Sequence, residues 1–322
     1  MPTVVQTDRA WPDYEIERQI IEAAGYTLVT GDPVPASEAA IEALIKQHNP
    51  VAIMTCWAVV NAAAISAPEH LSIVQRVGVG LDNIAVDAAT ARGCWVANVP
   101  DYCIGEVSDH AIAMLLDWAR EVTAFDRDVK AGQWAPANAR CRRLSDLTVG
   151  IIGFGQTGQA TAHRLRAFGC RVLAHTRTPQ PDAMAELCDL DTLLGHSDAV
   201  IIHAPLNAQT TKLINASRLA QMKPGAFLIN VSRGPIVDNA ALIAALDSGH
   251  LSGAGLDVID GEPSPPRTLV ERHNVVVTPH IAFSSDASIN ELRAKAAKNV
   301  VRVLAGGDPL FPCNHPHQQA SQ

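Results

Sequence analysis

The chain has 322 residues, 48% of them hydrophobic, and its 25 Lys and Arg against 33 Asp and Glu give a formal net charge of −8 at pH 7. This length predicts two domains, and the hydrophobic fraction excludes a mainly disordered chain. The negative charge gives no bulk attraction to nucleic acid or anionic lipid, and no apolar run reaches the ~18 residues of a membrane span. We therefore expect neither a nucleic-acid partner nor a membrane partner.

The seven cysteines are scattered and are never spaced as CxxC, and the twelve histidines do not cluster. This pattern argues against a disulfide framework and against a zinc site, so we predict no metal. Reduced thiols are typical of a cytoplasmic protein, which is the location we expect.

Short β-rich runs alternate with helical stretches in the first third of the chain. Strands are predicted at 4–7, 27–30, 51–55, 73–77 and 95–98, and helices at 13–24, 37–47 and 86–92. An alternation with a period of roughly 20–25 residues is typical of a parallel sheet covered by helices.

A long helix is predicted at about 105–131, and a second alternating block follows it. Strands are predicted at 148–152, 171–175, 199–203, 226–231, 253–258 and 275–278, and helices at 156–168, 190–194, 216–221, 239–248 and 285–304. Since no strand follows the last helix, we expect that helix to return to the first domain. The polar, Pro-containing tail 308–322 is predicted to be loose.

The predicted fold is α/β, with two doubly wound parallel-sheet domains. Only the second block contains a phosphate-binding loop, which suggests one domain for a cofactor and one for a substrate. We assign residues 1–99 and 284–322 to a discontinuous substrate domain and residues 100–283 to a dinucleotide-binding domain.

The string GFGQTG (Gly153–Gly158) follows a predicted strand at once and opens a predicted helix. Gly153 permits the tight turn, Gly155 lets the backbone approach a pyrophosphate, and Gly158 lets the helix pack close to the strand. The N-terminus of the helix then offers N–H groups and a positive dipole end to phosphates. This context predicts dinucleotide binding.

The acidic residue that would accept hydrogen bonds from the adenosine ribose is absent. No Asp or Glu occurs between Leu147 and Pro181, and the second strand ends in AHTRT, with Thr176 in the acidic position and Arg177 beside it. Without the carboxylate a 2′-phosphate is not repelled, and Arg177 could pair with it. The alternative is that Arg177 stacks on adenine or points to water. We predict NAD(P) as the cofactor, with NADP or dual use favoured over strict NAD.

Three polar residues follow strands of the second block: Arg233 in NVSRGPIVD, Glu262 in GLDVIDGEP and His280 in VVTPHIAFSS. Each alone is compatible with a structural or solvated role. Because ligands bind at the carboxyl ends of parallel strands, we expect the three side chains to converge on one crevice.

Together these three residues provide what hydride transfer to a small 2-oxo acid requires. Arg233 can hold a carboxylate and polarise the carbonyl, and His280 can donate a proton to the carbonyl oxygen. An ionised Glu262 within hydrogen-bond reach would favour the protonated imidazole. The first block adds RVGVGLDN, where Val77, Gly78, Val79 and Gly80 form a possible anion nest or a purely structural turn.

With these pieces in place, the chain resembles the D-isomer-specific 2-hydroxyacid dehydrogenases. The resemblance runs from about Val51 to Leu304, and its strings keep the family's order. They are RVGVGLDNI, ARGCWVANVPDYCIGEVSDHAIAMLL, VGIIGFGQTG, HAPLNAQTTKLIN, MKPGAFLINVSRGPIVD, GAGLDVIDGEP and VTPHIAF. It implies an oxidoreductase that acts on the CH–OH group of a D-2-hydroxy acid with NAD(P), and a Rossmann-type domain inserted into a flavodoxin-like domain.

The resemblance also implies functional residues. Catalytic residues would be Arg233, Glu262 and His280, and the 2-oxo acid would contact Val77–Gly80, Arg233 and His280. Cofactor contacts are implied at Val107, Phe154, Gly155, Gln156, Thr157, Thr176, Arg177, His203, Ala204, Pro205, Val231, Ser232 and Asp257, the last toward the carboxamide. A homodimer built around the long helix and the arm near 105–143 is implied as well.

One alternative remains open. The segments PDYC and HIAFSS resemble a branch that includes the C-terminal-binding-protein co-repressors. The chain would then be a dinucleotide-sensing binding protein with weak or vestigial dehydrogenase activity. The intact set of Arg233, Glu262 and His280 favours the enzyme.

Overall fold

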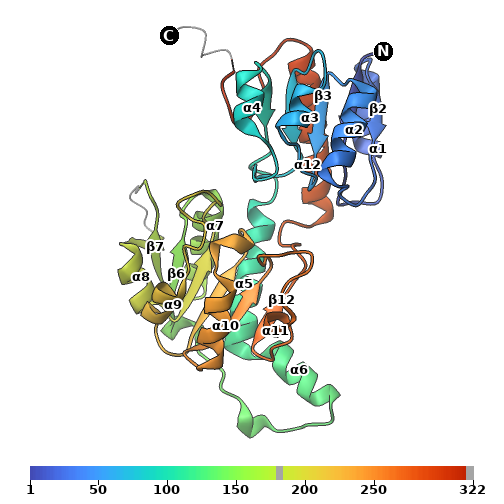
Figure 1. Cartoon of the computed structure of the whole chain (residues 1–322). Coiled ribbons are helices and arrows are strands. Elements are labelled where there is room, and N and C mark those ends of the chain that lie inside the picture. Colours follow the sequence, from blue (N-terminus) through green and yellow to red (C-terminus); the bar gives the residue numbers. More distant parts are fainter. Residues whose placement is uncertain (179–183, 317–322) are drawn as a thin grey trace. The chain divides into compact units, whose positions relative to one another are not determined.

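The computed structural model describes residues 1–178 and 184–316. The chain divides into two compact units: the first comprises Met1–Tyr102 and Ser285–Gln322, and the second comprises Cys103–Ser284 (Figure 1). Each unit contains one parallel sheet with helices on its faces, which confirms the predicted α/β class. Within the described ranges, no helix combines the length and the apolar character that a bilayer span needs.

The first unit is a five-stranded parallel sheet in the order β2-β1-β3-β4-β5. Its strands are β1 (Thr3–Gln6), β2 (Thr27–Thr30), β3 (Ala52–Thr55), β4 (Ile73–Arg76) and β5 (Trp95–Ala97). Its helices are α1 (Glu15–Ala23), α2 (Glu38–His48), α3 (Ala62–Ser66), α4 (Val86–Ala91) and α12 (Asp286–Leu304). Strands β3 and β4 are buried at every position because helices cover both faces of the sheet. The sequence prediction missed the short helix α3.

The last helix, α12, packs against α1 and against strands β3 and β4. A buried ion pair fixes this contact, because the guanidinium of Arg293 donates to Glu17 Oε1 at 3.0 Å and to Glu17 Oε2 at 2.8 Å. Arg293 also donates to Asp13 Oδ1 at 2.6 Å. Both ends of the chain therefore contribute to the first unit.

The expectation of a loose tail is wrong for its described part, while residues 317–322 lie outside the described residues. The backbone N–H of Cys313 donates to Val96 O at 2.8 Å, and Asn314 Oδ1 accepts from Val96 N at 2.7 Å. Asn314 Nδ2 donates to Cys94 O at 2.9 Å. The tail satisfies the backbone groups of β5 because β5 is an edge strand with one unpaired side.

The second unit is a seven-stranded parallel sheet in the order β12-β11-β10-β9-β6-β7-β8. Its strands are β6 (Thr148–Ile152), β7 (Arg171–His175), β8 (Glu186–Leu187), β9 (Ala199–Ile202), β10 (Ala226–Asn230), β11 (Leu251–Leu256) and β12 (Val275–Val277). Its α-helices are α5 (Ile104–Arg120), α6 (Val122–Lys130), α7 (Gln156–Ala167), α8 (Leu190–His196), α9 (Ala216–Gln221), α10 (Asn239–Asp247) and α11 (Arg267–Val270). Three short 3₁₀ helices are η1 (Pro136–Asn138), η2 (Leu144–Asp146) and η3 (Gly234–Ile236).

Two apolar layers cover this sheet. One contains side chains of α5 and α7, such as Leu115 and Leu165, and the other contains side chains of α8, α9 and α10, such as Leu193 and Leu242. Strand β6 lies between β9 and β7, so the chain leaves the middle of the sheet in two opposite directions. In doubly wound sheets this reversal opens a crevice at the carboxyl ends of the strands, where ligands bind.

The single long helix predicted at 105–131 is wrong, because the structure divides it into α5 and α6 at Glu121. Glu121 has a left-handed φ of 57°, which a continuous helix cannot contain. The carboxylate of Asp117 stabilises the break by accepting a hydrogen bond from the backbone N–H of Thr123 at 2.7 Å. Helix α5 buries one face in the second unit, whereas α6 buries none of its side chains.

Candidate active site

The glycine turn between β6 and α7 has the shape expected for a dinucleotide site. Gly153 has a φ of +95°, and a Cβ there would lie 2.5 Å from the backbone nitrogen of Ala204. A Cβ on Gly158 would lie 2.3 Å from Gly153 O, whereas a Cβ on Gly155 would meet no atom within 4 Å. Gly153 and Gly158 are thus required by packing, and Gly155 leaves open space in front of the helix.

The first turn of α7 fits a pyrophosphate. It contains no acidic residue, and no side chain caps the helix. The N–H groups at this helix end therefore remain available to an anion, at the positive end of the helix dipole. Gln156 and Thr157 belong to this first turn, while Phe154 is buried in the core beneath it.

Among the described residues directly after β7, 176–178, there is no carboxylate, as the sequence indicated. Thr176 is half-buried there, and Arg177 is exposed and donates to Gln209 Oε1 at 3.4 Å. Residues 179–183, which follow, lie outside the described residues. The edge that would face the adenosine ribose is therefore neutral or basic over its described residues.

His203, at the end of β9, lies against the glycine turn. Its Nε2 is 2.9 Å from Thr161 Oγ1, and that hydroxyl is 3.0 Å from the carbonyl of Thr157. The Thr161 hydroxyl has one proton, which goes to the carbonyl, so His203 Nε2 is the donor to Thr161. Burial lowers the pKa of His203 to about 4, so its ring is neutral at pH 7. The side chain of this predicted cofactor residue thus joins α7 to β9.

Two further predicted cofactor segments are linked to each other. The hydroxyl of Ser232, after β10, donates to the carbonyl of Ala204, after β9. Val231 is buried in the same apolar layer that Val107 of α5 contacts, and Pro205 is exposed. The loops after neighbouring strands β9 and β10 are therefore fastened together at their carboxyl ends.

Arg233 follows β10, in a loop that is held by the buried side-chain amide of Asn230. Asn230 Nδ2 donates to Arg233 O at 2.9 Å, and Asn230 Oδ1 accepts from the backbone N–H of Ser232 at 3.1 Å. A Cβ on the next residue, Gly234, would lie 2.2 Å from the carbonyl carbon of Ile259. The Arg233 loop therefore packs directly on the segment that leads from β11 to Glu262.

His280 and Glu262 are in direct contact. His280 Nδ1 lies 2.7 Å from Glu262 Oε1, and both side chains are partly exposed. Glu262 is placed by its own loop, because its Oε2 accepts from Ile259 N at 3.3 Å. The structure thus brings the two side chains within hydrogen-bond distance of each other.

Asp257, predicted to face a carboxamide, holds the His280 loop. Its buried carboxylate accepts hydrogen bonds from the Thr278 hydroxyl at 2.5 Å and from the backbone N–H groups of Ile281 and Ala282, each at 2.9 Å. Sequence reasoning missed the supporting residues Asn230 and Thr278. Their only signal was a polar residue at the end of, or just beyond, an otherwise apolar strand.

The Val77–Gly80 segment lies in the first unit, directly after β4. Arg76 is buried and donates to the carbonyls of Val77 at 2.6 Å and Gly80 at 2.9 Å. The Gly78 carbonyl accepts from Val99 N, and the Val79 carbonyl accepts from Asn98 Nδ2. The N–H groups of Gly78, Val79 and Gly80 have no acceptor within the residues that the structure describes. This arrangement suits an anion nest.

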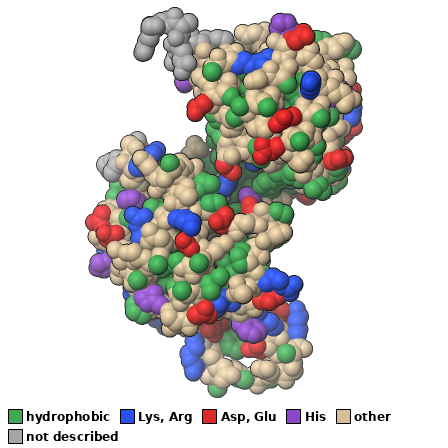
Figure 2. All heavy atoms as spheres, viewed as in Figure 1, with side chains coloured by type: hydrophobic (Ala, Val, Ile, Leu, Met, Phe, Trp, Pro, Cys, Tyr) green, Lys and Arg blue, Asp and Glu red, His purple; other side chains and the backbone are tan. Residues whose placement is uncertain are grey.

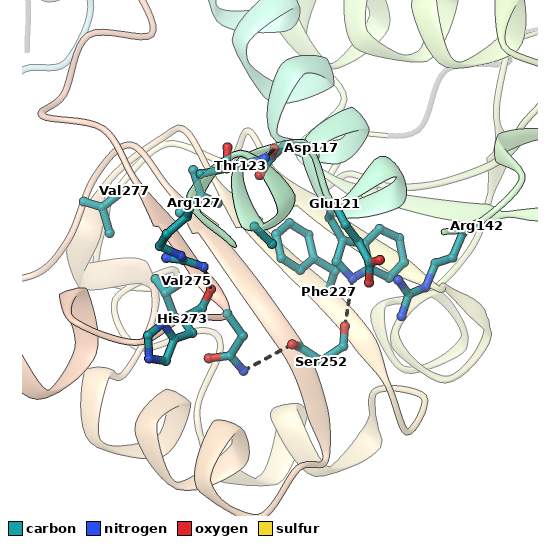
Figure 3. Close-up of a pocket in the computed structure, with 14 residues that line it drawn as sticks. Asp117, Glu121, Thr123, Arg127, Arg142, Phe227, Ser252, His273, Val275 and Val277 are labelled. Carbon is teal, nitrogen blue, oxygen red and sulfur yellow. Dashed lines mark hydrogen bonds between the residues drawn. The ribbon is translucent and has the colours of Figure 1, made fainter. Parts of the chain in front are cut away.

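A separate pocket of about 350 Å³ lies elsewhere in the second unit (Figure 3). Its floor is Trp118, stacked on Phe227 with ring centroids 5.1 Å apart, and the Arg142 guanidinium lies 4.2 Å from the Trp118 ring centroid. Phe227 and Ser252 stand near the amino ends of β10 and β11, so the pocket is at the opposite end of these strands from Arg233. It is not the candidate active site. Within the described residues, no group of three or more His, Cys, Asp or Glu could hold a metal ion.

Comparison with known proteins decides the family. The family model for the NAD-binding domain of D-isomer specific 2-hydroxyacid dehydrogenases matches residues 112–282, more than half of the chain. The chain belongs to this family. The resemblance predicted from the sequence is thus confirmed, and so is the two-domain α/β fold that these dehydrogenases share.

Relatives within the family differ in their names. A glyoxylate reductase of Thermococcus litoralis is 38% identical over 255 residues, which cover 76% of this chain and 77% of that protein. A D-3-phosphoglycerate dehydrogenase of Mycobacterium tuberculosis is 39% identical over 251 residues, which cover 77% of this chain. The match spans only 48% of that longer enzyme, so the chain spans about half the length of such relatives.

A solved member of the family provides a structural comparison. It is an NADPH-dependent glyoxylate/hydroxypyruvate reductase of Sinorhizobium meliloti in complex with NADP and malonate. The TM-score is 0.85 at 32% identity, and the alignment covers 97% of this chain and 96% of that one.

Proposed function

We propose that this family member is an NAD(P)-dependent oxidoreductase that interconverts a small 2-oxo acid and the corresponding D-2-hydroxy acid. The observation that carries the proposal is the His280–Glu262 pair. It follows strands β11 and β12 of the unit that also contains the glycine turn, and the Arg233 loop packs against Ile259, in the segment that leads to Glu262. The names of the glyoxylate reductases support the same class of substrate.

A reduced nicotinamide cofactor, if bound at the glycine turn, would supply a hydride for the carbonyl carbon. Arg233 binds the substrate carboxylate and polarises the carbonyl. Since Nδ1 of His280 faces Glu262, Nε2 is the ring atom that delivers a proton to the carbonyl oxygen as the hydride reaches carbon. A hydride added to carbon and this proton added to oxygen would together convert the C=O group to CH–OH, while Glu262 orients the His280 ring through its contact with Nδ1. The N–H groups of Gly78, Val79 and Gly80, in the first unit, stay a separate proposed site for an anion.

The test measures oxidation of NADPH and NADH with glyoxylate, hydroxypyruvate and pyruvate. We expect turnover of at least one acid, and His280→Ala should lower kcat about 10²- to 10⁴-fold because the general acid is lost. His196→Ala, at the exposed end of α8, is the matched control and should not change kcat. Tight cofactor binding without turnover of any 2-oxo acid would instead support the co-repressor-type binding protein, which no present observation favours.

For the cofactor we propose that NADP is preferred or that both forms are used. The family model describes an NAD-binding domain, whereas the Sinorhizobium meliloti reductase binds NADP. The neutral Thr176 and the exposed Arg177 at the end of β7 support use of the phosphorylated form here. A guanidinium pairs with a phosphate, and no described carboxylate at this edge repels one.

Replacement of Arg177 tests this preference. Arg177→Ala should raise KM for NADPH about tenfold and leave KM for NADH within about twofold, because only NADPH carries the phosphate. Arg166→Ala, at an exposed position near the end of α7, is the control and should change neither. A wild-type preference for NADH of about a hundredfold would contradict the proposal.

We further propose that the chain forms a homodimer through α6 and the arm at 131–143, and that it resides in the cytoplasm. Helix α6 buries none of its side chains, yet it presents Val122 and Val129 at 61% and 48% exposure. The adjacent pocket offers Trp118 together with charges of both signs, namely Asp117, Glu121, Arg127 and Arg142 (Figure 3). Seven free cysteines support a reducing compartment.

The proposed partners are small acids and a second copy of the chain. On the face shown in Figure 2, acidic and basic side chains of the described residues are interspersed and form no continuous basic patch. Together with the net charge of −8, this distribution gives no support for a nucleic-acid partner.

A further inference from the structure

The backbone of His280 has a conformation that its surroundings must maintain. His280 is a non-glycine residue with a left-handed φ of 55°, which is disfavoured for an imidazole side chain in an isolated loop. Its N–H donates to the carbonyl of Asp257 at 2.8 Å, and the next two N–H groups donate to the Asp257 carboxylate. The orientation of the imidazole toward Glu262 therefore depends on Asp257.

Two side chains that the proposed mechanism does not use, Thr278 and His110, hold the Asp257 carboxylate in place. Thr278 Oγ1 lies 2.5 Å from Asp257 Oδ1 and 2.9 Å from His110 Nε2. An ionised carboxylate only accepts hydrogen bonds, so the Thr278 proton points to Asp257. Thr278 Oγ1 must then accept from His110, which makes Nε2 the protonated nitrogen on this side of the ring.

Helix α5 fixes the position of His110 relative to the sheet. His110 and Met114 are four residues apart, so they lie on the same face of α5. A Cβ on Gly255 of β11 would lie only 3.0 Å from Met114 Cβ and Sδ, so the helix touches the sheet two residues before Asp257. The position of His110 relative to Asp257 is therefore set by direct packing, and His110 Nε2 lies 3.7 Å from Asp257 Oδ1.

We propose that His110 and Thr278 are positioning residues, which act through Asp257 to hold the imidazole of His280 against Glu262. The inference rests on the proposed function only where it predicts an effect on kcat. The ordering of the His280 loop itself follows from the contacts between His110, Thr278 and Asp257. Neither His110 nor Thr278 needs to touch substrate or cofactor for this role.

The first arm of the test does not depend on activity. In water, the Nδ1 proton shared by His280 and Glu262 should give a downfield proton NMR signal, assigned by its absence from His280→Ala. We expect the signal to persist in Thr278→Ser and His110→Gln, which keep a donor. In Thr278→Val and His110→Phe the signal should be lost, because the proton of a less ordered His280 exchanges rapidly with water. An unchanged signal in both of these variants, or no signal in the wild-type protein, would overturn the proposal.

The second arm separates positioning from general stability. Thr278→Val should lower kcat at least tenfold while the Kd of the reduced cofactor stays within twofold, and Thr278→Ser should restore kcat to within about threefold of wild type. An equal loss in the Val and Ser variants, or a parallel loss of cofactor binding, would overturn the positioning role. If the wild-type protein reduces no 2-oxo acid, the proposed function fails, and the NMR arm still decides this proposal.

Discussion

At the scale of single residues, His203 shows how burial determines a protonation state. Its ring donates to Thr161, and burial lowers its pKa from 6.5 to about 4. The unfolded chain therefore binds a proton between these pH values while the folded chain does not. The folded state loses stability relative to the unfolded state as pH falls from 6.5 toward 4.

We expect this single histidine to reduce the free energy of unfolding by about 3 kcal/mol between pH 7 and pH 4. His203→Gln, which keeps a donor toward Thr161 but does not titrate, should show a smaller decrease over the same range. Urea unfolding of both proteins at several pH values measures the difference. Parallel pH profiles for the two proteins would show that His203 is solvated in the folded state.

At the scale of secondary-structure elements, the glycine turn between β6 and α7 combines two requirements. Gly158 is needed for the approach of α7 to the turn, because its Cβ would collide with Gly153 O. Gly155 has open space around it and an ordinary extended conformation, so the fold itself tolerates a side chain there. Folding and ligand binding thus place separate demands on neighbouring glycines of one motif.

This separation predicts opposite results for two alanine variants. Gly155→Ala should leave the free energy of unfolding within about 0.5 kcal/mol of wild type and should raise the cofactor Kd about tenfold or more, because its methyl group enters the pyrophosphate space. Gly158→Ala should destabilise the protein by about 1–3 kcal/mol, since α7 must shift. Chemical denaturation and cofactor fluorescence titration measure both quantities. Unchanged cofactor affinity in Gly155→Ala would refute the assigned role of the turn.

At the scale of the whole molecule, the α6 segment is a part of the chain whose burial is incomplete. Nine helical residues that bury no side chain gain little from packing, and a short isolated helix is marginal in water. A second copy that covers α6 and the neighbouring pocket would supply the missing contacts. The proposed homodimer therefore has a structural reason in addition to the family expectation.

Light scattering of the purified protein should give twice the 34.2 kDa chain mass at micromolar concentration. Val122→Glu combined with Val129→Glu should shift the mass toward the monomer, because it places charges in the apolar face of α6. Val34→Glu, at a position of 74% exposure in the first unit, is the matched control and should remain dimeric. A monomeric wild-type protein would refute the interface.

Much of this molecule was predictable from local patterns. The alternation of apolar strands and helices indicated two parallel sheets, because period and turn residues are properties of neighbouring positions. The turn Gly153–Gly158 and the missing carboxylate at Thr176 were readable for the same reason. The break at Glu121 was not predictable, since the helical pattern continues through it and only tertiary packing separates α5 from α6.

The sequence by itself determined the family, the parallel α/β class and the identity of the polar residues at the strand ends. Only the tertiary structure decided which of them meet. Glu262 and His280 are 18 positions apart and come within 2.7 Å because adjacent parallel strands end at the same edge. The supporting contacts from His110 to Thr278 and Asp257 join residues up to 168 positions apart. Hydrogen bonds between such distant residues leave no periodic signal, because each depends on the packing of elements that local sequence does not specify.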